Sequence, residues 1–287
     1  MIFNNLELND NLPLTCTLEG TCCFGNNVYI NPWEIYNLSK GLKIQPQDFI
    51  HFHTTDGGIK LAFNGKYEKT SKKSCNLYDE KKGCSVHHHR PLACRLFPLG
   101  RKIQSNKTSY FFEGKNHPCL ERCPSALNLP KIKLIDYIKQ QKTSNFEIVQ
   151  EQYLDILQNI ADTAFALYLE TEAKLKDKGK TLKGWKNLTK KNNIEIGNLF
   201  TTEWKKIILY PFDLNQNYDE KLFIENHISI IEQKIQEEIN QIENLDEIIS
   251  YSIHLITISI FIGKSIGADM DKILKKWIED AKEFSKQ

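Results

Sequence analysis

The cysteines of this chain are distributed very unevenly along its 287 residues. All eight lie in the first 123 residues. A chain of this length can bury a large core without cross-links, so the cysteines need a chemical explanation rather than a stabilising one. In a reducing cytosol, clustered cysteines more often bind metal or do redox chemistry than form disulfides. The sequence therefore predicts a thiolate metal site drawn from Cys16, Cys22, Cys23, Cys75, Cys84, Cys94, Cys119 and Cys123.

Three bulk features predict the location and the partners. The first ten residues contain no basic residue and no apolar run of signal-peptide length, which argues against export. The longest apolar run, Ile248 to Ile262, contains polar residues and is shorter than the ~20 residues of a membrane-spanning helix. A net charge of +2 gives no case for nucleic acid. We therefore expect a cytoplasmic protein that binds metal ions, with no membrane or nucleic-acid partner and with a protein substrate or partner left open.

One segment is much more basic than the chain as a whole. Between Lys60 and Lys107 there are twelve Lys and Arg residues against Glu68, Asp79 and Glu80. Two interpretations stay open. The cations form a solvated face, or they offset thiolate charge, since four thiolates on one divalent ion leave a net charge of −2.

A helix start follows the first group of cysteines. In Asn31-Pro32-Trp33-Glu34, Asn is the cap, Pro takes the first helical position and Glu is the capping partner. This capping role makes Glu34 a weaker candidate for a metal ligand. We expect the helix to end near Lys40, a short second helix to begin near Pro46, and His51 to His53 to be extended.

Short strands are expected before the central cysteines. Asn64-Gly65 separates Ile59–Phe63 from Lys66–Glu68, which is a strong hairpin signal. A further strand is predicted from Cys75, followed by a tight polar turn. This arrangement would bring Cys75 and Cys84 close enough to share one ion.

The spacing of the other cysteines leaves alternatives open. For the adjacent Cys22 and Cys23, the loop turns sharply, or the pair serves two metal positions, or a strained disulfide joins them. Cys119 and Cys123 are one helical turn apart, on the same side. His117 is a possible additional ligand next to them.

The segment Arg90-Pro91-Leu-Ala-Cys94-Arg95-Leu-Phe-Pro98 predicts a short helix. Pro suits its first position, and Cys94 falls in the first turn, where a thiolate is favoured over a thiol. Arg90 and Arg95 are candidate cofactor-binding residues that donate to sulfur or to a carboxylate, with ordinary surface arginines as the alternative. Of His87, His88 and His89, at most one can be a ligand, because consecutive side chains do not share a face.

After Pro130 the hydrophobic pattern takes a helical period. The predicted fold class is α+β: a cysteine-rich metal-binding region with short hairpins and helices over residues 1–130, and an all-α region over residues 131–287. No phosphate loop or catalytic triad is apparent in the second region. Its expected elements are a helical pattern from Leu134 that continues in a long helix to near Lys176, a loop or short turn-helix over Lys174 to Asn193, an amphipathic helix over Ile224 to Ile242, a buried helix over Asp246 to Ile262, and a final helix over Asp269 to Phe284.

The order of these motifs resembles the family of zinc- or iron-chelating cysteine-cluster proteins, often called YkgJ-type. The resemblance covers roughly the first 125 residues and implies metal binding through the cysteines. This chain has His87 where the family often has an aromatic residue, so a packing contact is lost or a ligand is gained. The residues that carry the match are Cys16, Cys22, Cys23, Glu34, Cys75, Leu77, Gly83, Cys84, Arg90, Pro91, Cys94, Arg95 and Pro98.

The choice of metal and of function leaves three hypotheses. Eight soft ligands favour an iron–sulfur cluster or iron, or alternatively zinc, over hard cations, and they exceed the four that one zinc needs. The first hypothesis is a metal- or cluster-binding protein. The second follows a more distant resemblance to flagellin lysine N-methylases, which implies a protein-modifying enzyme with the cluster near its active site. The third is a structural zinc module with a partner-binding helical domain.

Overall fold

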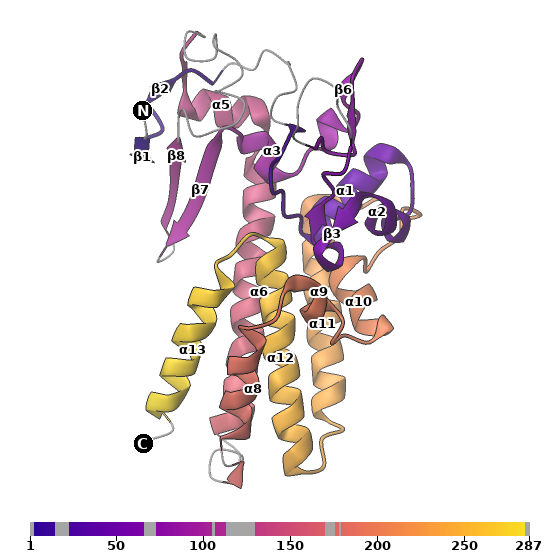
Figure 1. Ribbon diagram of the computed structural model, residues 1–287, viewed down its shortest axis with the longest axis vertical. Coiled ribbons are helices and arrows are strands. Elements are labelled where there is room, and N and C mark those ends of the chain that lie inside the picture. Colours follow the sequence, from indigo (N-terminus) through magenta and orange to yellow (C-terminus); the bar gives the residue numbers. More distant parts are fainter. Residues whose placement is uncertain are drawn as a thin grey trace. The chain divides into compact units, whose positions relative to one another are not determined.

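The computed structural model describes residues 3–14, 23–65, 73–104, 107–112, 130–169, 176–177 and 179–284. Short strands dominate the N-terminal half and long helices the C-terminal half (Figure 1). The predicted α+β class is therefore confirmed. The chain forms two compact units, which we call the cysteine unit (Met1–Val28, Asn37–Ile44 and Leu61–Ile148) and the helical unit (Tyr29–Tyr36, Gln45–Lys60 and Val149–Gln287).

The main sheet of the cysteine unit is an antiparallel hairpin with one added strand. Strand β7 (Leu99–Gln104) pairs with β8 (Lys107–Phe112). Strand β1 (Phe3–Leu6) lies on the other side of β8, giving the order β1-β8-β7. Strand β2 (Asn11–Leu12) pairs with β9 (Ile132–Lys133). These N-terminal strands have no clear alternation in the sequence, and their pairing partners are more than 100 residues away.

The remaining elements of the cysteine unit are short. Helix α3 (Leu92–Leu96) contacts both β7 and α5 (Leu134–Gln141). The Tyr137 hydroxyl on α5 donates to the carbonyl oxygen of Phe97. Two strands, β5 (Tyr78–Asp79) and β6 (Gly83–Cys84), form a tight hairpin. The 3-10 helix η3 (His87–His89) follows this hairpin directly.

Helix α1 (Pro32–Leu42) begins as the sequence predicts. The Asn31 side chain accepts from the Glu34 backbone N–H at 3.0 Å, and Glu34 Oε2 accepts from the Asn31 backbone N–H at 3.0 Å. Two otherwise unsatisfied amide groups are thereby paired. The next helix, α2 (Pro46–His53), includes His51 and His53, so the prediction of an extended segment there was wrong.

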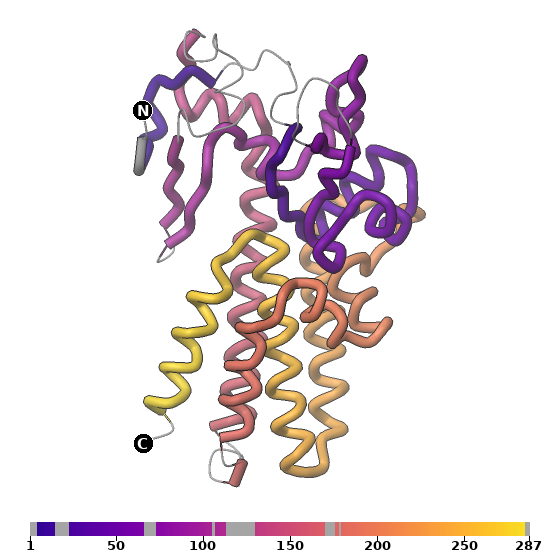
Figure 2. The backbone as a smooth tube through the Cα atoms, viewed as in Figure 1, coloured from indigo at the N-terminus to yellow at the C-terminus, as the bar shows by residue number. Residues whose placement is uncertain are grey.

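The helical unit is built on three long helices that run alongside one another (Figures 1 and 2): α6 (Ser144–Leu169), α11 (Glu220–Ile239) and α12 (Leu245–Ser265). The Ser252 hydroxyl on α12 donates to the Ala164 carbonyl on α6. The Tyr251 hydroxyl on α12 donates to the Ile235 carbonyl on α11. Both α8 (Lys180–Leu188) and α13 (Met270–Phe284) pack against α12.

Several short elements of the described chain were not predicted individually. Helix α9 begins with the reciprocal cap of Asn192 and Glu195. Helix α10 begins with the Thr201 hydroxyl accepting from the Trp204 amide. Both caps are visible in the sequence but precede helices too short to show a period. Their bounds are α9 Asn193–Gly197 and α10 Thr202–Leu209, and the other such elements are β3 Thr54–Thr55 and η2 Asp56–Gly58. Strand β4 (Lys60–Leu61) lies within the strand predicted over Ile59–Phe63 and pairs with β3, while the predicted partner Lys66–Glu68 lies outside the described residues.

Helix α12 is long and apolar enough to cross a membrane by length and composition alone, the single such helix in the described chain. Its most apolar window has a mean hydropathy of 1.5. However, 56% of that window is buried inside the protein, as is typical of a core helix. The sequence prediction of a buried helix over Asp246 to Ile262 is confirmed.

Candidate metal centre

A pocket of about 790 Å³ in the cysteine unit brings together all four cysteines that the structure describes. Cys23, Cys75, Cys84 and Cys94 come from four separate segments of the chain and line this one cavity. No disulfide joins any of the four to another of them. Apolar groups complete much of the wall: Val28, Leu38, Leu61, Phe63, Leu77, Val86, Pro91, Ala93 and Phe97.

A short antiparallel contact places the first two cysteines side by side. The Cys75 backbone N–H donates to the Cys23 carbonyl oxygen at 2.7 Å. Next to it, Phe24 forms a β-bridge with Ser74 and packs edge-on against the Tyr78 ring. This pairing joins positions about 50 residues apart in the sequence, so hairpin signals alone do not reveal it.

The third cysteine is positioned by the β5–β6 hairpin. Cys84 lies opposite Tyr78 in this hairpin. The Asp79 carboxylate closes the turn by accepting from the backbone N–H groups of Lys82 and Lys81, which lower the pKa of this carboxyl. The predicted polar turn is confirmed, but the residue paired with Cys84 is Tyr78 rather than Cys75.

The fourth cysteine lies on α3. Pro91 caps this helix, and its carbonyl oxygen accepts from the backbone N–H of Cys94 at 3.0 Å. The short helix predicted between the two prolines is therefore confirmed. Cys94 is half-buried and its neighbour Ala93 is exposed, both at the wall of the pocket.

The guanidinium of Arg95 binds backbone carbonyl groups. Its Nη2, Nε and Nη1 atoms donate to the carbonyl oxygens of His88, Arg90 and Gln141, at 2.6, 2.7 and 2.9 Å. The same guanidinium lies 4.4 Å from the centre of the Phe146 ring. The Arg95 side chain is buried, and it ties the loop before α3 to the end of α5. These contacts make Arg95 an organiser of the pocket wall.

Arg90 does line the pocket, as a cofactor-binding residue would. Its Nε donates to the His87 carbonyl oxygen at 2.9 Å, and its Nη2 donates to the Gln141 side chain at 3.0 Å. A longer contact of 3.5 Å joins Nη1 to the Cys94 carbonyl oxygen. Arg90 thus holds its charge close to the backbone that carries one of the four thiols.

The three consecutive histidines have three different environments. His87 lines the pocket with the cysteines, and burial, followed by the charge of Arg90, lowers the pKa of its imidazole. His88 is exposed. His89 is fixed outside the pocket: its Nδ1 lies 3.1 Å from Asn37 Oδ1, and its carbonyl oxygen accepts from Asn37 Nδ2. Only one of the three therefore has access to the thiols, as the sequence argument requires.

Gly41 makes room for His89. A Cβ at this helical position would lie 2.8 Å from the His89 ring. Gly41→Ala normally stabilises a helix by about 1 kcal/mol, but here we expect overpacking to destabilise the cysteine unit by about 1–3 kcal/mol. In a His89→Ala background the added methyl group meets no ring. Chemical unfolding should then show that Gly41→Ala raises the free energy of unfolding of the cysteine unit. Stabilisation by Gly41→Ala in the otherwise unchanged protein would contradict the contact.

The charge of the pocket rim is positive. Lys81, Lys82 and Arg90 line it together with a single carboxylate, Glu80. Such a rim complements a site whose thiolates and metal sum to a negative charge. Within the described ranges, no three His, Cys, Asp or Glu side chains are arranged to hold one metal ion. The four thiols share a cavity without closing around a single point.

The other predicted ligands lie outside the described residues: Cys16, Cys22, Cys119 and Cys123, together with His117. The adjacent pair therefore has one member, Cys23, at the pocket and one outside the described chain. Glu34 is described, and its carboxylate takes part in the α1 cap within the helical unit.

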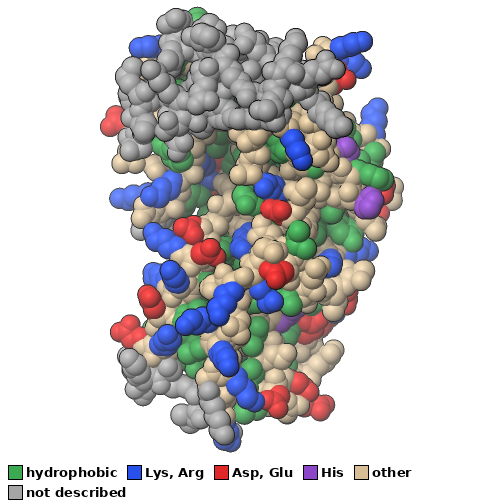
Figure 3. All heavy atoms as spheres, in the orientation of Figure 1, with side chains coloured by type: hydrophobic (Ala, Val, Ile, Leu, Met, Phe, Trp, Pro, Cys, Tyr) green, Lys and Arg blue, Asp and Glu red, His purple; other side chains and the backbone are tan. Residues whose placement is uncertain are grey.

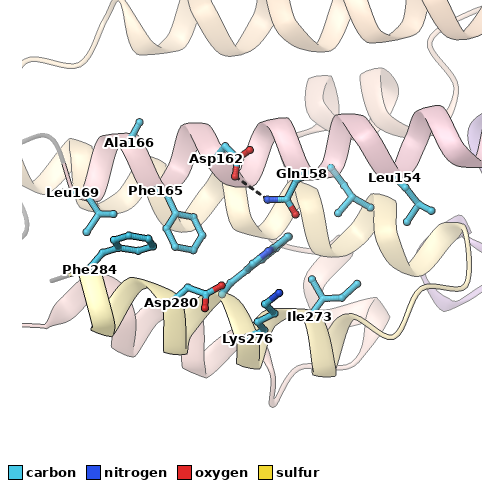
Figure 4. A pocket seen from close by; sticks show the side chains of 12 residues that line it. Leu154, Gln158, Asp162, Phe165, Ala166, Leu169, Ile273, Lys276, Asp280 and Phe284 are labelled. Atoms are coloured by element: carbon cyan, nitrogen blue, oxygen red, sulfur yellow. Dashed lines mark hydrogen bonds between the residues drawn. The ribbon is translucent and has the colours of Figure 1, made fainter. Parts of the chain in front are cut away.

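A second pocket lies within the helical unit, between α6 and α13 (Figure 4). It has a volume of about 630 Å³ and an apolar wall that includes Phe165 and Leu169. Gln158 donates to the Asp162 carboxylate at its edge. On the face shown in Figure 3, Lys and Arg side chains are interspersed with Asp and Glu, in keeping with the net charge of +2. Neither feature identifies a chemistry for the helical unit.

Comparison with known proteins gives one family match, which covers the cysteine-rich part of the chain. Residues 15–124 match the model of the family CxxCxxCC, described as "Putative zinc- or iron-chelating domain". Neither the curated proteins nor the solved structures gave a match. The family match ends before α5, so the resemblance to lysine N-methylases stays a prediction. The matched range contains all eight cysteines, so the part of the chain over residues 15–124 is similar to this family of zinc- or iron-chelating domains.

Proposed function

We propose that the cysteine unit binds iron through its thiolates, in the form of an iron–sulfur cluster. The observation that carries the proposal is the convergence of Cys23, Cys75, Cys84 and Cys94 on one pocket. These residues are as many as 71 positions apart in the sequence, from Cys23 to Cys94. Thiolates are the preferred ligands of both iron–sulfur clusters and zinc. The family match supports chelation of zinc or iron.

The number of cysteines supports a cluster or more than one ion. One zinc ion needs four thiolates, and the chain has eight cysteines within its first 123 residues. Four of them line one pocket of about 790 Å³. A cluster presents several metal atoms to ligands on different walls. The cations of Lys81, Lys82 and Arg90 would offset its negative charge.

The chain's own residues have separate roles in this proposal. The four described cysteines supply thiolates, and Cys16, Cys22, Cys119 and Cys123 are proposed to supply the rest. Arg95 holds the loop before α3 through three carbonyl groups, and so fixes the position of Cys94. Bound iron would supply one-electron redox chemistry.

The test is to purify the protein without oxygen and measure its metal, its acid-labile sulfide and its absorption spectrum. We expect iron and sulfide in comparable amounts, with broad visible absorption from sulfur-to-iron charge transfer. One or two equivalents of zinc in a colourless solution would overturn the iron version and leave a structural zinc module. In that case, removing the zinc should unfold the cysteine unit.

A further inference from the structure

The three histidines next to the pocket differ in what their side chains contact. The His89 ring lies against Gly41 and bonds Asn37, and His88 is exposed. His87 is half-buried and lines the cavity with the four thiols. Its backbone oxygen is engaged by Arg90 Nε. Within the described ranges, neither of its imidazole nitrogens makes a hydrogen bond, and the one aromatic ring next to it is that of His88, with 5.8 Å between the ring centres.

The local backbone places His87 and Cys84 at the same wall. Between them, the Ser85 hydroxyl and amide both bond the Leu77 carbonyl oxygen, and Val86 is buried. These contacts fix the two intervening residues, while the residues on either side line the pocket. A gap of two residues between ligands is common in thiolate metal sites. Imidazole is a regular partner of thiolate for both zinc and iron–sulfur centres.

From this placement we infer that His87 is a metal ligand, which donates an imidazole nitrogen to the centre that the cysteines form. The inference rests on the proposed function and deepens it, since the centre would then have mixed sulfur and nitrogen ligation. The lone pair of a neutral imidazole forms the bond. One neutral nitrogen in place of a thiolate makes the centre less negative by one charge. In iron–sulfur centres, replacing thiolate by imidazole raises the reduction potential.

The test compares two neighbouring substitutions, His87→Phe and His88→Phe, in anaerobically purified protein. Phenylalanine keeps a ring in each position and so preserves packing. X-ray absorption at the edge of the bound metal, iron or zinc, detects coordinated imidazole by the scattering of its outer ring atoms. We expect this signal in the unchanged protein and in His88→Phe, and its loss in His87→Phe. If the bound metal is an iron–sulfur centre, a thiolate at this position should lower its reduction potential, so the potential should fall in His87→Cys and stay unchanged in His88→Cys.

Other outcomes separate the two proposals. Metal bound with sulfur scattering alone, or an imidazole signal that survives in His87→Phe, would overturn the role of His87 and leave the proposed function intact. A protein that binds no metal at all would overturn both. Circular dichroism of His87→Phe shows whether the fold persists. If the fold is lost, His87→Gln, which removes the ring but keeps a polar side chain, gives the same comparison.

Discussion

Replacing Cys84 or Cys94 with serine is expected to lower the affinity for metal at least about tenfold. The variant with both substitutions should retain almost no metal after purification. Loss of residues that merely orient ligands already costs about 10–100-fold in metal affinity, so loss of ligands should cost no less. Both side chains are half-buried at the pocket wall. Serine has nearly the same volume as cysteine, so the change acts on the ligand atom rather than on packing. Elemental analysis of anaerobically purified variants measures the result.

The matched control is Ala93→Ser. This residue lines the same pocket next to Cys94 and is exposed, so the substitution adds a serine hydroxyl without removing a thiol. Metal content should stay at the level of the unchanged protein. If Cys84→Ser, Cys94→Ser and the double variant all kept full metal content, Cys84 and Cys94 would not be ligands. A loss in Ala93→Ser equal to that in Cys94→Ser would instead point to damage of the pocket wall.

The second large effect concerns the acid stability of the helical unit. His227 on α11 is fully buried, and its Nε2 donates to the Ile207 carbonyl oxygen at 2.7 Å. The Tyr153 hydroxyl on α6 lies 2.7 Å from Nδ1 and donates to it. Burial lowers the pKa of His227 to about 4, from 6.5. The folded protein therefore holds this imidazole neutral, while the unfolded chain takes up a proton below pH 6.5.

The sign of the pH dependence follows from that difference. Stability rises with pH wherever the unfolded state binds more protons. The contribution of His227 is thus complete above pH 6.5 and is lost as the pH falls to about 4. The gap between these two pKa values corresponds to about 3 kcal/mol.

Tryptophan fluorescence measures this effect selectively, because all four tryptophans, Trp33, Trp185, Trp204 and Trp277, belong to the helical unit. Denaturant unfolding at pH 7 and pH 4.5 should show a much smaller loss of stability in His227→Gln than in the unchanged protein. Glutamine can still accept from Tyr153 and donate to Ile207. His51→Gln, at an exposed position of the same unit, should behave like the unchanged protein. Equal pH dependence in all three proteins would show that His227 is not held neutral.

Much of the local structure is predictable because it depends on neighbouring residues. The reciprocal cap of Asn31 and Glu34 spans three residues and appears as predicted. The turn closed by Asp79 is equally local. The extended segment predicted over His51 to His53 was wrong because an alternating pattern of three residues cannot distinguish a strand from the last turn of a helix.

The contacts made over long sequence distances were not predictable. The cofactor-binding role of Arg95 stays a prediction, but the bonds of its guanidinium to backbone carbonyl groups, one of them 46 residues away on α5, have no signal in the sequence. The division of the chain is also non-local: Tyr29–Tyr36 and Gln45–Lys60 belong to the helical unit, although they lie between cysteines. A pattern in one sequence does not show which distant segments belong to the same unit, because that depends on which surfaces meet after folding.

By itself, the sequence determined the class of chemistry and the positions of most long helices. The softness of a thiol ligand is a property of the residue type. Helix caps and the hydrophobic period of a helix depend only on residues within a few helical turns of each other. Only the tertiary structure decided that Cys23, Cys75, Cys84 and Cys94 share one pocket, and that His87 rather than His88 or His89 joins them. The physical reason is that a binding site is defined by side-chain directions on distant segments, which are set when the chain packs.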